Sequence, residues 1–360
     1  MLQRNFGLDL MRAAAILMVV TVHAPKTFPG EQIPSMLSVD LFFALSGFLI
    51  AQMMVERFDG ISTWPALRAF MLNRWLRIFP LYYLTLAAFL VYAALRYPPS
   101  WTGGSFVAPW QFVFFLSDLT AGRPNDHGYF SFFLVSWSLS IEELFYFGCP
   151  LVALLTGRWR RSPIFWICLG AAVIVATILA RLWVYLQVDD GSLTEDSAYR
   201  RATFLRADVF VYGAAIYWLC QRGFFTRRNA LLVAAIGLVT LLWCAVHYIA
   251  APDGFFSKIW LLSLVPMACA MLIPAAMMLP APNVIGGLIR LLSTRTYALY
   301  LTHMLVPAVW FIFVAITPTN YLWSLAISFL LANLLHIALE RPFMQLRPMD
   351  ASHKVPALAE

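Results

Sequence analysis

An arginine and a histidine share one face of an apolar segment near the start of the chain. Arg12 and His23 are eleven positions apart, so an α-helix would place them about 20° apart around its axis and about 16 Å apart along it. Ionisable side chains in such segments are costly and indicate a function by default. Here they offer a cation at one depth and a proton acceptor at another. The alternative interpretation is structural, with Arg12 paired to Asp9 and His23 at a hydrated helix end.

A carboxylate opens the next apolar segment, in the stretch SVDLFFALSGFLIA. Because the connection from His23 is short, we expect Asp40 to return at about the depth of that imidazole. A neighbouring carboxylate fixes the tautomer of a histidine and supports its protonated form, as a general base requires. Asp40 would also suit a helix N-terminus, and the two interpretations are compatible. Further along, Ser46 and Gly47 are expected to allow close helix packing.

Two arginines precede a third apolar segment, in the stretch NRWLRIFPLYYL. Arg74 and Arg77 are three positions apart and would share one face of a helix. Two guanidiniums on one face could clamp a phosphate group. The simpler interpretation, a topogenic charge at a membrane boundary, is favoured for the pair taken alone.

Two adjacent carboxylates lie in the stretch SWSLSIEELFYF. Glu142 and Glu143 would point about 100° apart on a helix, so at most one of them faces a polar cavity easily. Ser138, four positions before Glu142, is expected to support that carboxylate. The alternative is an interfacial position, since Trp137 and Tyr146 are typical of an aromatic belt.

Two smaller polar groups complete the candidates. Arg206 and Asp208 open another apolar segment, where we expect them to form an ion pair. Thr296, Tyr300 and His303 fall at i, i+4 and i+7, which places them on one face of a helix. For this face, hydrogen bonding between helices is favoured over catalysis.

The composition excludes an ordinary soluble protein. Of the 360 residues, 61% are hydrophobic and 12% charged, and the mean hydropathy is +0.75. Soluble domains carry about 25% charged residues, and disordered chains are more polar still. We therefore expect an all-α, polytopic transmembrane bundle. Arginines in cytoplasmic loops account for the net charge of +7 without a nucleic-acid partner, and the cysteines lack the paired spacing of a metal site.

Ten apolar runs are long enough to cross a bilayer, which takes about 20 residues. The distribution of arginine and lysine places both termini in the cytoplasm and the chain in the cytoplasmic (inner) membrane. The stretch 97–135 is expected to be interfacial or re-entrant. We expect an integral membrane domain at 1–345, a short cytoplasmic tail at 346–360 and no fused soluble domain. The expected spans are 8–24, 39–56, 77–96, 137–156, 163–186, 204–221, 229–250, 257–279, 295–315 and 320–339.

Six segments occur in the order found in a known family. They read GLDLMRAAAILMVVTVHA, VDLFFALSGFLIA, RWLRIFPLYYL, SWSLSIEELFYF, LRADVFVYGAA and STRTYALYLTH, and a closing ERP follows at 340–342. Each is weak by itself, but six in order, with ten residues between Arg12 and His23, make a specific signal. The chain thereby resembles the acyltransferase-three family of membrane O-acyltransferases.

The resemblance implies ten spans, an acyl-CoA donor and a carbohydrate acceptor, usually a sugar hydroxyl on a polysaccharide, lipid-linked glycan or cell-wall component. Acyl-CoA is then a co-substrate, with acetyl the expected group, and no cofactor is expected. Asn73 stands where many members have a further basic residue, so a weaker donor clamp is expected. The matching positions are His23 for the essential histidine, Arg12 for its motif arginine, Arg74 and Arg77 for the donor-associated basic pair, and Asp40 and Glu142 for the recurring acidic residues.

The implied reaction begins when cytoplasmic acyl-CoA docks its phosphates on the basic pair. Arg12 would hold a donor phosphate or carbonyl at mid-depth. His23, oriented by Asp40, would take the proton of the acceptor hydroxyl as that hydroxyl attacks the thioester. Alternatively, His23 would act as a nucleophile and carry the acyl group itself. Glu142 would bind sugar hydroxyls or assist proton removal.

Two other functions stay open at the level of sequence. A transporter or flippase for a glycan or lipid-linked sugar would carry similar buried charges, although the chain lacks the internal symmetry that transporters often have. An acyltransferase that moves succinyl or longer groups, or that acts on a small metabolite, would share the same features. Binding of acyl-CoA would distinguish an acyltransferase from a transporter. The dimensions of the pocket would distinguish acyltransferases that use different acyl groups or acceptors.

Overall fold

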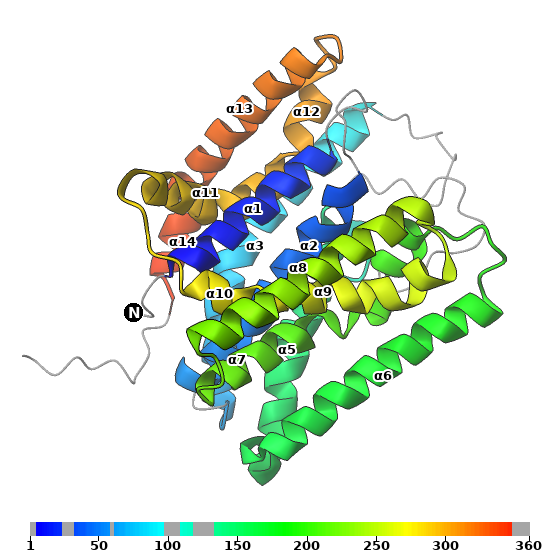
Figure 1. The fold of residues 1–360 in the computed structure, drawn as a ribbon. Helices are drawn as coiled ribbons and strands as arrows, with labels where there is room; N and C mark the ends of the chain where they lie inside the picture. Colours follow the sequence, from blue (N-terminus) through cyan, green and yellow to red (C-terminus); the bar gives the residue numbers. More distant parts are fainter. Residues whose placement is uncertain (1–4, 24–31, 58–60, 97–108, 118–132, 348–360) are drawn as a thin grey trace, which may run out of the picture.

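The structure, a computed structural model, describes residues 5–23, 32–57, 61–96, 109–117 and 133–347. Within these ranges every regular element is a helix, and the helices form a bundle (Figure 1). The predicted all-α class is thereby confirmed. The helices are α1 (Phe6–Val22), α2 (Gln32–Gln52), η1 (Met53–Arg57), α3 (Trp64–Arg96), α4 (Pro109–Val113), α5 (Ser136–Leu155), η2 (Gly157–Arg161), α6 (Pro163–Gln187), η3 (Glu195–Arg200), η4 (Thr203–Arg206), α7 (Val209–Gln221), α8 (Arg227–Ala250), η5 (Ser257–Leu261), α9 (Leu262–Met271), α10 (Ile273–Met277), α11 (Asn283–Thr302), α12 (Leu305–Trp310), α13 (Pro318–Leu335), η6 (His336–Glu340) and α14 (Arg341–Gln345).

In the described part of the chain, seven helical stretches are long and apolar enough to cross a membrane. Each overlaps one of the predicted spans, and together they confirm a multi-pass membrane protein. They are Leu37–Glu56, Trp64–Arg96, Ser136–Leu155, Pro163–Gln187, Arg227–Ala250, Ser257–Met277 and Pro318–Gln345.

The other three predicted spans are helical but shorter or interrupted. Helix α1 has 17 residues and α7 has 13, and the chain before α7 forms the short 3₁₀-helix η4. In the predicted span 295–315, α11 ends at Thr302 and α12 begins at Leu305. The count of ten spans and the cytoplasmic termini therefore stay predictions.

Helix α3 begins earlier than its predicted span. Its 33 residues extend for about 50 Å, well beyond a hydrocarbon core of about 30 Å. Within the stretch 97–135, the five-residue helix α4 is too short to cross, and it packs on α3. The hydroxyl of Tyr82 donates to the carbonyl of Phe112 at 2.8 Å. Residues 97–108 and 118–132 lie outside the described residues, as does most of the predicted tail, from residue 348.

Helices α1 and α2 lie in the middle of the bundle. Helices α11 and α13 pack on one side of them, and α7, α8 and α9 on the other (Figure 1). One apolar cluster joins α1 and α2 to α7–α10, and a second joins α1 to α3, α5 and α11. In lipid, such contacts stabilise a bundle chiefly through close packing.

Helix α6 lies along one edge of the bundle (Figure 1). Only 6% of its membrane-spanning window is buried, so nearly all of its surface is left for lipid. Its buried side chains are Thr177, Arg181 and Val184, all in its second half. Arg181 donates to Asp208, Ser263 and the carbonyl oxygen of Leu205, and these contacts hold this end of α6 against the bundle.

Two glycines let α2 and α7 cross with their backbones in contact. A Cβ on Gly47 would lie 2.1 Å from the carbonyl oxygen of Phe210, and one on Gly213 would lie 2.0 Å from that of Ala44. Neither position can hold a side chain unless the helices move apart. The close packing predicted at Gly47 is confirmed.

We expect Gly47→Ala and Gly213→Ala each to destabilise the protein by about 1–3 kcal/mol, because overpacking forces the two backbones apart. The measurement is the Tm of the detergent-purified protein. Gly148→Ala in α5 is the matched control, since no atom lies within 4 Å of a Cβ built there, and alanine is the better helix former. Equal Tm values for Gly47→Ala and Gly148→Ala would contradict the proposed backbone contact.

Candidate functional site

His23 lies at the carboxyl end of α1, as the residue that caps it. The helix begins at an asparagine cap, where the side chain of Asn5 accepts from the amide of Leu8. At the other end, Nδ1 of His23 lies 2.8 Å from the carbonyl oxygen of Val19. A carbonyl can only accept, so Nδ1 carries the proton in this contact.

His303 caps α11 and meets His23 edge to face. Its Nδ1 lies 2.7 Å from the carbonyl oxygen of Tyr300 and therefore also carries a proton. In the neutral ring its Nε2 is then an acceptor, and this atom lies 3.3 Å from Nδ1 of His23. The ring centroids are 4.9 Å apart at an interplanar angle of 66°. The two contacts of His23 use the same nitrogen, so its Nε2 is left with a lone pair.

A cavity of about 330 Å³ adjoins both histidines. This volume is at the lower end of the range for small-molecule sites. Its walls come from α1, α2, α5, α8, α11 and the segment 195–206 between α6 and α7. The polar and aromatic side chains that line it are His23, Ser38, Trp137, Asp196, Arg200, Arg201, Tyr248, Tyr300 and His303.

Asp40 does not contact His23, so the predicted carboxylate–imidazole pair is wrong. Ser38 and Val39 line the cavity, whereas Asp40, a further 100° around α2, points to the segment 195–206. There it is fully buried and accepts from Arg200 at 3.2 Å and from Arg206. Two guanidiniums compensate a buried carboxylate more completely than a neutral imidazole would.

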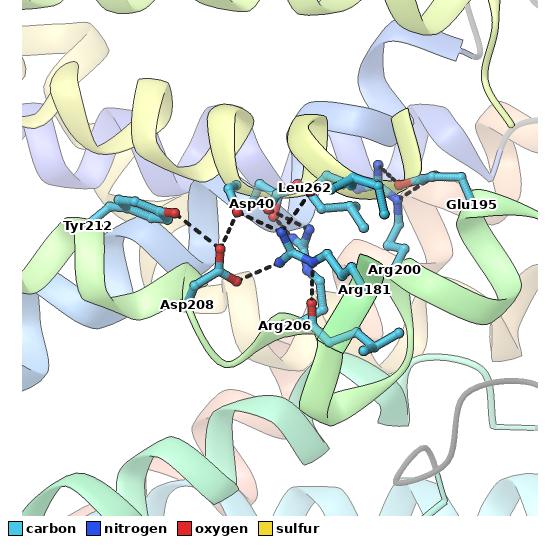
Figure 2. A network of polar contacts seen from close by, with 11 residues as sticks. Asp40, Arg181, Glu195, Arg200, Arg206, Asp208, Tyr212 and Leu262 are labelled. Carbon is cyan, nitrogen blue, oxygen red and sulfur yellow. Dashed lines mark hydrogen bonds and ion pairs between the residues drawn. The ribbon is translucent and has the colours of Figure 1, made fainter. Parts of the chain in front are cut away.

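Figure 2 shows the wider network to which Asp40 belongs. Nη1 of Arg206 donates to the carbonyl oxygen of Leu262 at 2.9 Å, which joins the segment 195–206 to α9. Nη2 of Arg200 lies 2.9 Å from Glu195. Burial lowers the pKa of Arg200, but the Glu195 and Asp40 carboxylates outweigh this and raise it, so its charge is secure.

Asp208 belongs to the same network but pairs with a residue of α6. Nη2 of Arg181 donates to it at 2.6 Å, and the hydroxyls of Tyr212 and Ser263 also donate to it. The predicted Arg206–Asp208 pair is therefore wrong: each residue has an oppositely charged partner from another helix (Figure 2). The network connects α2, α6 and α9 to the segment that walls the cavity.

Glu142 lies deeper in the bundle, with Arg74. Nη2 of Arg74 donates to it at 2.8 Å and the hydroxyl of Ser46 at 2.6 Å, while the guanidinium lies 3.5 Å from the ring centroid of Tyr146. Arg77 is exposed and forms no ion pair with the described residues. The structure thus separates the predicted basic pair into one arginine held by a carboxylate and one on the surface.

Glu143 is the more buried of the adjacent carboxylates, and its Oε1 has no hydrogen-bond partner among the described residues. Neither carboxylate is among the residues that line the cavity beside the histidines, so the prediction that at most one of them faces a polar cavity stays a prediction. Ser138 does not support Glu142, contrary to prediction. Its hydroxyl lies 2.5 Å from that of Tyr300, which lines the cavity. Tyr300 thus contacts His303 through its backbone carbonyl and Ser138 through its hydroxyl. Ser138 in turn lies one helical turn before Glu142.

Arg12 lies at the opposite end of α1 from His23. Its Nη1 donates to Asp9 at 3.4 Å, as the structural interpretation predicts, and Ser293 of α11 donates to the same carboxylate oxygen at 2.6 Å. Asp9 is buried, whereas the side chain of Arg12 is 25% exposed. The guanidinium is therefore accessible about 16 Å below the histidines.

The whole arrangement, from α1 to α14, falls within a known family. A family model described as an acyltransferase domain matches residues 5–341. The chain belongs to the acyltransferase-three family. This match includes every predicted site residue.

Curated relatives extend over most of the chain at low identity. Peptidoglycan O-acetyltransferase OatA of Listeria monocytogenes is 24% identical over 363 residues, covering 93% of the chain and 55% of that protein. Nodulation protein 10 of Rhizobium leguminosarum is 25% identical over 386 residues, covering 96% of the chain and 94% of that protein. The chain thus spans about half the length of the Listeria protein. No solved structure matches it.

The sequence alone did not predict that the segment 195–206, between α6 and α7, forms part of the cavity wall. The expected spans 163–186 and 204–221 leave residues 187–203 as a connection between them, yet Arg200 is buried and Asp196 and Arg201 line the cavity. A signal was present, since an acidic residue five positions before an arginine occurs twice in this stretch. Such spacing fits the single turn of η3, which contains the Glu195–Arg200 pair and ends one residue before Arg201, the partner of Asp196.

The contact between the histidines predicts one tautomer for His23. In ¹⁵N-histidine-labelled protein in nanodiscs, we expect His23 to carry its proton on Nδ1, because Val19 and His303 both accept there. His303→Leu removes one acceptor and should raise the population protonated on Nε2. His247→Gln, in α8 and outside the cavity, serves as the control and should leave the His23 signals unchanged. An Nε2-protonated His23 in the unmodified protein would contradict the assignment.

Proposed function

We propose that the chain is a membrane O-acyltransferase that moves an acyl group from acyl-CoA to a hydroxyl group of a carbohydrate. One observation carries the proposal: His23 lines a cavity and has an unprotonated nitrogen, in a chain that belongs to an acyltransferase family. The name of the Listeria relative, a peptidoglycan O-acetyltransferase, favours acetyl as the group and a surface glycan as the acceptor.

The cavity is the place where the acceptor hydroxyl meets the acyl group. Nε2 of His23 takes the proton of the hydroxyl as its oxygen attacks the acyl carbon, and general-base help of this kind contributes about 10²–10⁴-fold. His303 accepts from Nδ1 of His23 and thereby orients its ring, the role that the sequence analysis gave to Asp40. If His23 attacks the acyl carbon directly, the same free lone pair forms an acyl-histidine, and trapping a labelled enzyme would separate the two routes.

The donor enters from the end of the bundle that the arginine distribution assigns to the cytoplasm. Arg12, with its accessible guanidinium, and the exposed Arg77 meet the donor phosphates first. Arg74 is more buried than Arg77 and binds the donor inside the bundle, while Glu142 and Ser46 hold its guanidinium in place. This revises Glu142 from a residue that acts on the acceptor to one that positions Arg74. The protein then works as a multi-pass protein of the cytoplasmic membrane.

The decisive test compares the surface glycans of cells that carry the unmodified protein, His23→Ala or no protein. We expect mass spectrometry to find an acyl mass increment only with the unmodified protein, since His23→Ala lowers the rate by about 10²–10⁴-fold. His247→Ala is the matched control, because this histidine packs against Trp243 and Phe256 outside the cavity. Full acylation with His23→Ala would overturn the assignment of the base, and a purified protein that does not bind acyl-CoA would favour a transporter.

A further inference from the structure

A partly exposed ion pair borders the cavity beside the buried network. Asp196 and Arg201 both line the cavity and pair with each other, with 50% and 24% of their side chains exposed. They are also the charged side chains that act electrostatically on His23. Neither takes part in the contacts that hold the segment 195–206 to α2, α6 and α9.

Arg201 differs from the other three arginines of this region in how firmly it is held. Arg181, Arg200 and Arg206 are at most 4% exposed and are bound by buried carboxylates. Arg181 and Arg206 also donate to backbone carbonyls. Their charges are therefore neutralised by buried carboxylates that hold the helices together. An exposed ion pair such as Arg201–Asp196 adds little stability, so Arg201 can exchange its partner for another anion at small cost.

The helix ends around the cavity are electrostatically unfavourable for an anion, so an anion bound there requires a cation. Helices α1 and α11 both present their carboxyl ends here, at His23 and His303. The carboxyl end of a helix carries partial negative charge, which disfavours a developing anion. Acyl transfer nevertheless passes through a tetrahedral species with a negatively charged oxygen, and stabilising that oxygen is usually the largest catalytic contribution.

We propose that Arg201 is the oxyanion-binding residue of this site, and that it binds the carbonyl oxygen of an acyl thioester during transfer. The inference rests on the proposed function. The acceptor oxygen bonds to the acyl carbon, its proton passes to Nε2 of His23, and the carbonyl electron pair moves to the oxygen that faces Arg201. The carbon–sulfur bond then breaks, and the departing thiolate takes the proton from His23. Asp196 holds the guanidinium before the donor arrives and is a positioning residue.

The test uses the full chain in nanodiscs, acetyl-CoA as donor and a glycan extract of the source cells as acceptor, and it measures release of the CoA thiol. We expect Arg201→Ala to lower kcat by about 10²–10³-fold, the usual loss for an oxyanion donor, with the KM for acetyl-CoA unchanged. Arg201→Lys keeps the charge without the guanidinium geometry and should recover part of the rate. Asp196→Asn keeps the guanidinium and should lower kcat less than Arg201→Ala.

Arg228→Ala is the matched control, because Arg228 is exposed at the start of α8 and lies outside the cavity. The Tm of Arg201→Ala should equal that of the unmodified protein, which separates catalysis from folding. An unchanged kcat, or a rise in KM alone, would overturn the assignment and point to backbone amides at the start of α5. If His23→Ala is inactive while Arg201→Ala keeps its kcat, only this inference fails. If the unmodified protein releases no CoA, the proposed function fails.

Discussion

Inside an apolar bundle, the fully buried carboxylate of Asp40 is bound by two guanidiniums. An unpaired buried charge costs several kcal/mol, whereas a charge with matched partners is tolerated. Arg200 and Arg206 supply those partners from a segment that contains only two short helices, η3 and η4. This segment has little regular structure of its own, so its ion pairs to α2 and its hydrogen bonds to α6 and α9 determine its position. The cavity wall beside His23 depends on them.

The charges of the bundle therefore fall into two groups. Those of Arg181, Asp208, Arg206 and Asp40 are fully buried and serve the fold. Other charges are partly exposed, among them that of Arg12, which pairs with Asp9 at one end of α1, and that of Arg201, which pairs with Asp196 beside the cavity. Between them lie the neutral histidine pair and the hydroxyls of Tyr300 and Ser138.

The sequence was sufficient to predict the helical class, the seven helical stretches long and apolar enough to cross a membrane, the glycine contact of α2 and the residue types of the site. It did not predict which residues contact one another across neighbouring helices. Helical periodicity gives the depth and face of a residue on its own helix, but not the rotation of that helix against its neighbours. The Asp40–His23 and Ser138–Glu142 contacts were inferred from depth and spacing alone. Asp40 instead faces η3 and η4, which fold back against the bundle and have no strong periodic signal.

The central claim is that Asp40 serves the fold through Arg206 and does not orient His23. Double-mutant cycles on the free energy of unfolding in detergent test it directly. For Asp40→Ala with Arg206→Ala, the account predicts a coupling energy of about 1–3 kcal/mol, as for residues in one ion-pair network. For Asp40→Ala with His23→Ala, it predicts additivity within about 0.5 kcal/mol. Strong coupling of Asp40 to His23, together with additivity for Asp40 and Arg206, would contradict it.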